Sequence, residues 1–109
     1  MKQPLEYLKH IRDECEFLVN VTRGLTLDGY KNDKTLKRAV ERSMEIIGEA
    51  SKRVPDDFKQ AHPEIGWKDM AGMRDVLIHG YFGVDDKIVW DVLNNHIPPL
   101  LKKVRDIIK

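Results

Sequence analysis

Residues 33–54, DKTLKRAVERSMEIIGEASKRV, carry the clearest structural pattern in the chain. Apolar side chains recur there every three or four residues, which predicts a helix with one apolar face. Asp33 stands where a capping side chain is expected. Gly48 lies inside this helix, and because a helical glycine costs about 1 kcal/mol relative to alanine, it indicates close approach of another helix. The apolar face consists of Leu36, Val40, Met44, Ile47 and Val54.

The same helical spacing extends over most of the chain, and no alternating strand pattern of useful length occurs. Residues 24–32 and 55–66 are rich in turn-forming residues and are expected as loops. Pro98 and Pro99 are expected to interrupt the chain before a last short helix. The other expected helices cover 4–22 with Pro4 in the first turn, 67–79 with Gly80 as the stop, and a segment from an Asp85 cap through Leu93.

These elements predict one all-α domain over residues 1–109, an antiparallel bundle of four to five helices. The chain has 109 residues, with 19 Lys and Arg, 18 Asp and Glu, 4 His and a single Cys. Cys15 has no partner for an internal disulfide and lies on an apolar stripe, so a small buried thiol is expected. The first residues, MKQPLEYLKH, do not resemble a signal peptide, and no apolar run is long enough to span a membrane. A cytoplasmic protein is therefore expected.

Charge is balanced overall but not locally. Residues 31–42 hold five Lys or Arg against two acidic residues, and residues 97–109 hold four against one. Two such basic faces suit a phosphate backbone, and solvated helix faces are the plainer interpretation of each.

Several chemistries lack their usual residues. The histidines show no H-x-x-x-H spacing, and Cys15 has no second cysteine for a zinc site. The chain has no P-loop and no GxGxxG motif. No metal and no bound cofactor are therefore expected.

One segment combines reactive side chains: residues 73–81, MRDVLIHGY. Asp75 and His79 are four residues apart, so on a helix the carboxylate can hold one imidazole nitrogen. Arg74 and His79 are five apart, which places them about 140° apart around a helix axis. The two converge only if Arg74 reaches round the helix or if two copies of the helix meet in a composite cleft.

Arg74 and His79 together suit chemistry on phosphate. A guanidinium presents a planar set of donors to phosphate oxygens, and an imidazole can accept the proton of a ribose 2′-hydroxyl. That pair is sufficient for RNA cleavage without a metal. The plainer alternative is a surface Arg74, an Asp75–His79 helix pair, and a His79 that interacts with the helix dipole.

The segment resembles the signature of HEPN domains, and the pattern R-x4-H-x-Y from Arg74 to Tyr81 resembles their HepT-like branch. The resemblance extends from about residue 5 to residue 108. It also includes RAVER at 38–42, IIGEA at 46–50, Trp67, HGYFGVD at 79–85, Trp90, and Pro99 with Leu100.

The resemblance implies a ribonuclease toxin that forms a homodimer and cuts RNA in a cleft between the protomers. Arg74 and His79 would be the catalytic pair, with Asp75 in a supporting role. The partner would be a minimal nucleotidyltransferase antitoxin that transfers AMP to Tyr81.

Two other functions remain open at this stage. One is a non-catalytic HEPN-type module that binds a nucleotidyltransferase or a nucleic acid. The other is a helical assembly factor in which the motif is only a helix end. Trp67 and Trp90 are expected to be core or interface anchors, and Glu49 is expected to pair with Arg42 or Arg53.

Overall fold

The computed structural model describes residues 3–78 and 85–109, and for residues 74–76 and 78 it describes the backbone only. Within those ranges every regular element is helical, which confirms the predicted all-α class. The elements are α1 (Pro4–Thr22), α2 (Leu27–Lys31), α3 (Lys34–Arg53), α4 (Asp56–Ala61), α5 (Trp67–Ile78), α6 (Asp86–Asp91), the π-helical turn η1 (Val92–His96) and α7 (Ile97–Ile108).

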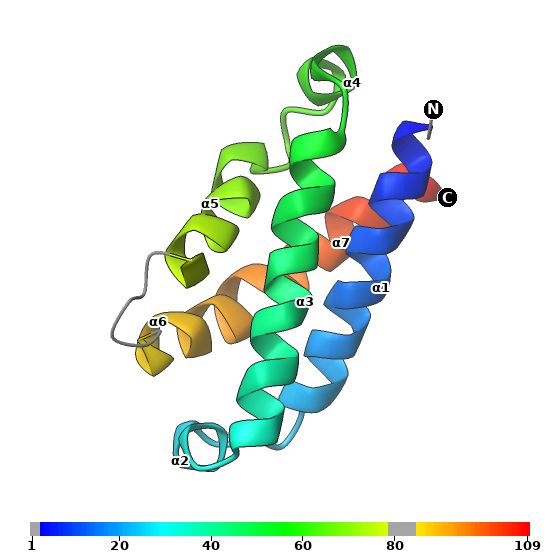
Figure 1. Ribbon diagram of the computed structural model, residues 1–109. Helices are drawn as coiled ribbons and strands as arrows, with labels where there is room; N and C mark the ends of the chain where they lie inside the picture. Colours follow the sequence, from blue (N-terminus) through cyan, green and yellow to red (C-terminus); the bar gives the residue numbers. More distant parts are fainter. Residues whose placement is uncertain (1–2, 79–84) are drawn as a thin grey trace.

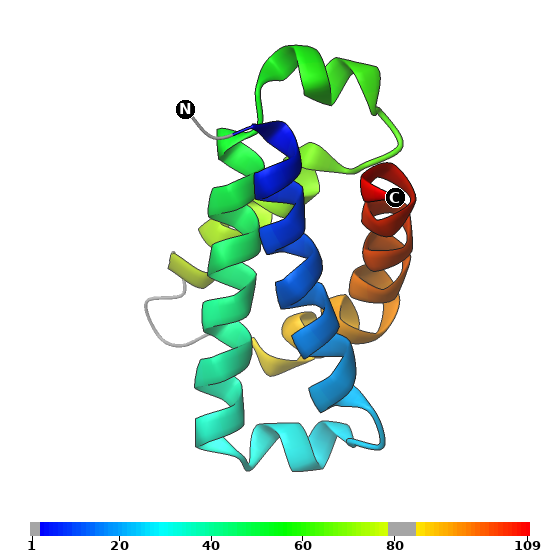
Figure 2. The same ribbon diagram turned by 90° about the vertical axis from the view of Figure 1, so that its right-hand side faces the viewer.

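The bundle is formed by α1, α3, α5 and the continuous segment α6–η1–α7 (Figure 1). The long helices α1 and α3 run antiparallel and side by side, and α5 packs along α3. The continuous rod α6–η1–α7 passes behind α3 in the view of Figure 1, and α7 lies along α1 (Figure 2). The short helices α2 and α4 lie at opposite ends of the bundle.

The core lies where these rods meet, and it contains most of the apolar positions expected from the sequence. Burial of each large apolar side chain contributes roughly 1.5–3 kcal/mol to stability. The fully or nearly buried residues include Leu8, Ile11, Cys15 and Leu18 of α1, Val40, Met44 and Ile47 of α3, Met70 and Met73 of α5, and Leu93, Ile97, Leu101 and Val104 of the last rod.

The predicted helix caps are confirmed. The Asp33 carboxylate accepts a hydrogen bond from the backbone N–H of Leu36 at 2.9 Å. The Asp85 carboxylate accepts one from the N–H of Lys87, also at 2.9 Å. Gly48 is buried on α3, the helix on which α5 packs, in agreement with the close approach inferred from the sequence.

The two expected loops each contain a short helix, so that part of the prediction is wrong. In residues 24–32 the Thr26 hydroxyl caps α2 by accepting from the N–H of Gly29 at 3.0 Å. In residues 55–66, Asp56 and Asp57 occupy the first turn of α4, where carboxylates interact favourably with the helix dipole. Turn-forming residues and helix-starting residues are largely the same types, and a single helical turn needs few other signals.

Pro98 and Pro99 do not interrupt the chain, which corrects the second expectation. The N–H of Ile97 donates to the carbonyl of Val92, five residues earlier, and this bond closes the wide turn η1. A proline ring normally clashes with the carbonyl four residues before it and lacks an N–H. The wider π turn precedes both prolines, which therefore lie in the first turn of α7 without breaking the rod.

In the part of the chain that the structure describes, no helix has the length and apolar character required to cross a bilayer.

Candidate functional site

The predicted catalytic segment begins on α5. Arg74 and Asp75 lie on the backbone of this helix near its carboxyl end at Ile78. His79 and Tyr81 lie outside the described residues. The helical register of Arg74 and Asp75 agrees with the sequence analysis, while the Asp75–His79 pairing and the convergence of Arg74 with His79 stay predictions.

The amino-terminal end of α5 is held by aromatic contacts. The Trp67 indole N–H donates to the carbonyl of His62 at 3.0 Å. The Phe58 ring packs edge-on against Trp67, with 6.5 Å between the ring centroids. Trp67 and Trp90 both pack against the core, as expected from the sequence. These contacts therefore hold the first residues of α5, the helix that carries Arg74, against the preceding segment.

The middle of α5 is anchored by two methionines. Met70 and Met73 are buried in the core cluster that also contains Met44 of α3. Arg74 directly follows Met73, so its backbone is part of a packed helix. A site built on a packed helix is positioned more accurately than one on a loop.

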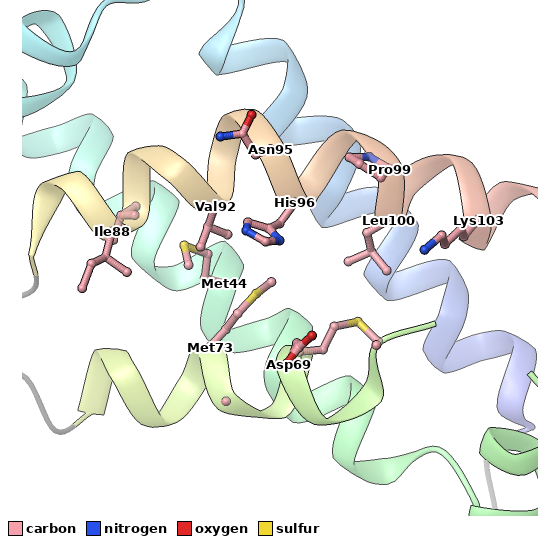
Figure 3. Close-up of a pocket in the computed structure, with 14 residues that line it drawn as sticks. Met44, Asp69, Met73, Ile88, Val92, Asn95, His96, Pro99, Leu100 and Lys103 are labelled. Atoms are coloured by element: carbon pink, nitrogen blue, oxygen red, sulfur yellow. The ribbon is translucent and has the colours of Figure 1, made fainter. Parts of the chain in front are cut away.

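A groove of about 510 Å³ runs between α5 and the rod η1–α7 (Figure 3). Its polar rim comprises Asp69 on α5 and Asn95, His96 and Lys103 on the opposite rod. Figure 3 shows the His96 imidazole directed across the groove toward α5. The apolar lining includes Met44, Met70, Met73, Val89 and Leu100. Sequence analysis missed this groove, because its residues come from three separate helices. The one available signal was Gly72, a glycine inside the expected third helix.

Three residues of the two basic segments form ion pairs within the described part of the chain. Lys37 pairs with Asp86 at 3.1 Å, and Arg42 pairs with Glu45 at 3.2 Å. Arg105 of α7 pairs with Glu16 of α1 at 3.1 Å. These contacts reduce the excess charge of both basic segments, most of all in residues 31–42. Lys102 and Lys103 remain exposed on α7 and have no ion pair within residues 3–78 and 85–109.

Two further predictions concern Glu49 and Cys15. Glu49 is exposed on α3 and lines a shallow hollow with Tyr7, His10 and Arg53. Arg42 pairs with Glu45, and the expected pairing of Glu49 with Arg42 or Arg53 stays a prediction. Cys15 is fully buried, and burial raises the pKa of its thiol to about 12. The expected buried core thiol is confirmed.

The fold and the motif define a class: a small all-helical domain whose packed helix α5 carries Arg74, with His79 and Tyr81 following that helix in the sequence. The family model described as Ribonuclease HepT-like matches residues 8–107. This chain therefore belongs to the HepT-like ribonuclease family.

The relatives agree with this assignment. The chain is 47% identical over 109 residues to "Putative RNase TTE0752" of Caldanaerobacter subterraneus subsp. tengcongensis, covering 100% of this chain and 97% of the relative. It is 45% identical over 104 residues to "Probable ribonuclease HepT" of Thermococcus cleftensis, covering 95% and 94%. It is 41% identical over 103 residues to "Putative RNase MJ0127" of Methanocaldococcus jannaschii, covering 94% and 85%. No solved structure matches the chain.

Proposed function

We propose that this protein is a metal-independent endoribonuclease and the toxin of a type II toxin–antitoxin pair that acts in the cytoplasm. The observation that carries the proposal is the R-x4-H-x-Y segment, Arg74 to Tyr81, inside a chain that matches the HepT-like ribonuclease family over residues 8–107. The substrate is RNA, and no metal or cofactor takes part.

The proposed reaction is transesterification within the RNA strand. His79 takes the proton of a ribose 2′-hydroxyl, and the 2′-oxygen attacks the adjacent phosphorus. The bond from phosphorus to the 5′-oxygen breaks, and an imidazolium returns a proton to that oxygen. The products are a 2′,3′-cyclic phosphate and a 5′-hydroxyl. Arg74 stabilises the negative charge on the pentacoordinate phosphorus, and Asp75 supports His79 by holding one imidazole nitrogen.

The active unit in this proposal is a homodimer. Five residues separate Arg74 from His79, so a single straight helix presents them about 140° apart. Two copies of the helix that meet across an interface can pair Arg74 of one protomer with His79 of the other. The resulting cleft contains two such pairs.

Control is proposed to occur at Tyr81. A minimal nucleotidyltransferase antitoxin transfers AMP from ATP to the Tyr81 hydroxyl, and pyrophosphate leaves. The added phosphate is negatively charged, so it competes with RNA for Arg74 and repels the RNA backbone.

The test is an RNA cleavage assay in excess EDTA on protein expressed without an antitoxin. Wild type, Arg74→Ala, His79→Ala and Tyr81→Phe are compared, and the new RNA ends are analysed. We expect cyclic phosphate ends from wild type and Tyr81→Phe, and a loss of about 10²–10⁴-fold for His79→Ala.

Two results would contradict the proposal. Equal cleavage by wild type and His79→Ala would assign the activity to another site or to a contaminant. No cleavage by a folded wild type without AMP on Tyr81 would favour a non-catalytic HEPN module that binds a nucleotidyltransferase or a nucleic acid.

A further inference from the structure

We propose that the groove between α5 and η1–α7 binds one unpaired nucleotide of the RNA substrate. The base enters between Met73 and His96, and its phosphate contacts Lys103. The identity of the ligand rests on the proposed ribonuclease function, whereas the site itself rests on the residues that line the groove.

The first observation is the size and lining of the groove. Its volume of about 510 Å³ lies within the range of roughly 300–1,000 Å³ that is usual for sites of small organic ligands. The floor is apolar and the rim is polar, as expected for a site that buries a flat ring and orients its edges. Ile88 lies at one end of the groove and is 50% exposed.

Gly72 is the second observation, because no contact within the described part of the chain accounts for it. It lies inside α5 and lines the groove. A Cβ atom placed there would meet no atom within 4 Å, and the one glycine with positive φ among the described residues is Gly24. A helical glycine that neither packing nor conformation requires costs about 1 kcal/mol relative to alanine. Close approach of a ligand to the backbone is a reason for its presence.

The third observation is the π turn that presents His96. Asp91 accepts a hydrogen bond from the Asn95 side chain at 2.6 Å, and its other carboxylate oxygen lies 3.3 Å from the His96 Nε2 atom. The Asp91 carboxylate thus binds the Asn95 side chain and lies beside the His96 ring at the rim. π turns within helices occur frequently at functional sites. An aromatic ring held in this way offers a face on which an unpaired base can stack.

The distribution of charge favours a nucleotide. Lys103 lies at the rim and has no ion pair in the described part of the chain, so it is available to a phosphate. Asp69 lies on the opposite wall and can accept hydrogen bonds from the amino group of a base. The wall that contributes Asp69 is α5, the same helix whose backbone carries Arg74. A nucleotide in the groove would therefore contact the same helix whose backbone carries Arg74.

The methionines provide a direct probe of this site. Three of the four methionines in the chain, Met44, Met70 and Met73, line the groove. The experiment labels methionine methyl groups with ¹³C in the full chain carrying His79→Ala, so that RNA is bound without being cut. A short single-stranded RNA of mixed sequence is then titrated while the methyl signals are recorded.

We expect saturable shifts of the Met70 and Met73 methyl signals. Gly72→Leu should fill the groove and weaken RNA binding by about fivefold or more, because stacking of a single base contributes about 1–3 kcal/mol, or about 5- to 150-fold in affinity. Lys103→Ala should weaken binding several-fold, whereas Lys102→Ala, which changes the neighbouring exposed lysine, should have a smaller effect. Circular dichroism is used to check that Gly72→Leu is folded. The comparison of Lys103→Ala with Lys102→Ala tests the site without relying on the Gly72 variant.

Two results would overturn the inference. RNA that binds without moving the methionine signals would place the nucleotide elsewhere. Signals that move with protein concentration alone, and not with RNA, would make the groove an interface between protein chains.

The outcomes also separate this inference from the proposed function. Methyl shifts on addition of RNA, together with no cleavage by wild type, would support the nucleotide site and contradict the proposed ribonuclease activity. Cleavage by wild type, together with no methyl shifts in the His79→Ala chain, would support the ribonuclease activity and contradict the nucleotide site.

Discussion

Lys37 of α3 and Asp86 of α6 form an ion pair at 3.1 Å that connects residues 49 positions apart. Asp86 is the first residue of α6, so the pair fastens the start of the last rod to the long helix α3. Both side chains are largely shielded from water, with 28% and 22% exposure. The chain on the carboxyl side of the Arg74–Tyr81 motif is therefore attached to the same helix that supports α5.

Glu41 lies one turn from Lys37 on α3, and we predict that Glu41→Gln stabilises the protein at pH 7. Burial raises the pKa of the Glu41 carboxyl, Lys37 lowers it, and the Asp86 and Glu45 carboxylates raise it. Because the folded pKa lies above its ordinary value of 4.5, the favourable contribution is present below pH 4.5 and is lost as the pH rises through the folded pKa. Ionised Glu41 thus destabilises the fold at pH 7.

Thermal unfolding at several pH values tests this. The Tm of Glu41→Gln should exceed that of wild type at pH 7, and the difference should vanish below pH 4.5. Glu45→Gln is the matched control on the same helix, and it should give no gain because Glu45 pairs with Arg42 at 3.2 Å. A lower Tm for Glu41→Gln at pH 7 would show that the carboxylate is stabilised by its neighbours.

The Cys15 thiol should be unreactive in the native protein. It is fully buried, and its pKa rises from an ordinary 9.0 to about 12. Thiol labelling at pH 8 should therefore be slow in buffer and rapid in denaturant. The raised pKa also means that its contribution to stability is present below pH 9 and is lost as the pH rises toward 12. Rapid labelling of the native chain would contradict the buried position of Cys15 on α1.

Alanine should have opposite effects at two glycines. Gly72→Ala should stabilise the protein by up to about 1 kcal/mol, since the added Cβ meets nothing within 4 Å and alanine favours a helix. A Cβ atom at Gly24 also has no atom within 4 Å, but the φ angle of 75° at this position is unfavourable for alanine by about 1–2 kcal/mol. Denaturant unfolding measures both changes. A loss of stability in Gly72→Ala would indicate an intramolecular reason for that glycine.

Two inactive variants should restore activity when they are mixed. If each catalytic site pairs Arg74 of one protomer with His79 of the other, a dimer of Arg74→Ala with His79→Ala contains one intact pair. Equal mixing with full exchange should recover about a quarter of wild-type activity, because about half the dimers are mixed and each has one working site. No recovery from verified mixed dimers would place both residues of a pair in one protomer.

The sequence was sufficient to predict the helical class, the principal apolar faces and the Asp33 and Asp85 caps. These features depend on local chemistry and on the helical period, which a single sequence displays. The short helices α2 and α4 were missed because Thr26, Gly29 and Asp56 are as typical of turns as of helix starts.

The continuous last rod was missed for a different reason. Proline strongly indicates a helix break, and the bond from Ile97 to Val92 that avoids it is a property of the folded backbone. The groove was missed because Asp69, His96 and Lys103 have no mutual spacing in the sequence and meet only through packing. The Arg74–Tyr81 motif was found from the sequence because all of its residues lie within one segment of eight residues.

The central claim is tested most directly by the rate of RNA cleavage in excess EDTA, measured for wild type and His79→Ala purified without an antitoxin. The account predicts cleavage by wild type and a loss of about 10²–10⁴-fold in the variant. Equal rates for the two proteins, or a wild-type rate that depends on added metal, would contradict it.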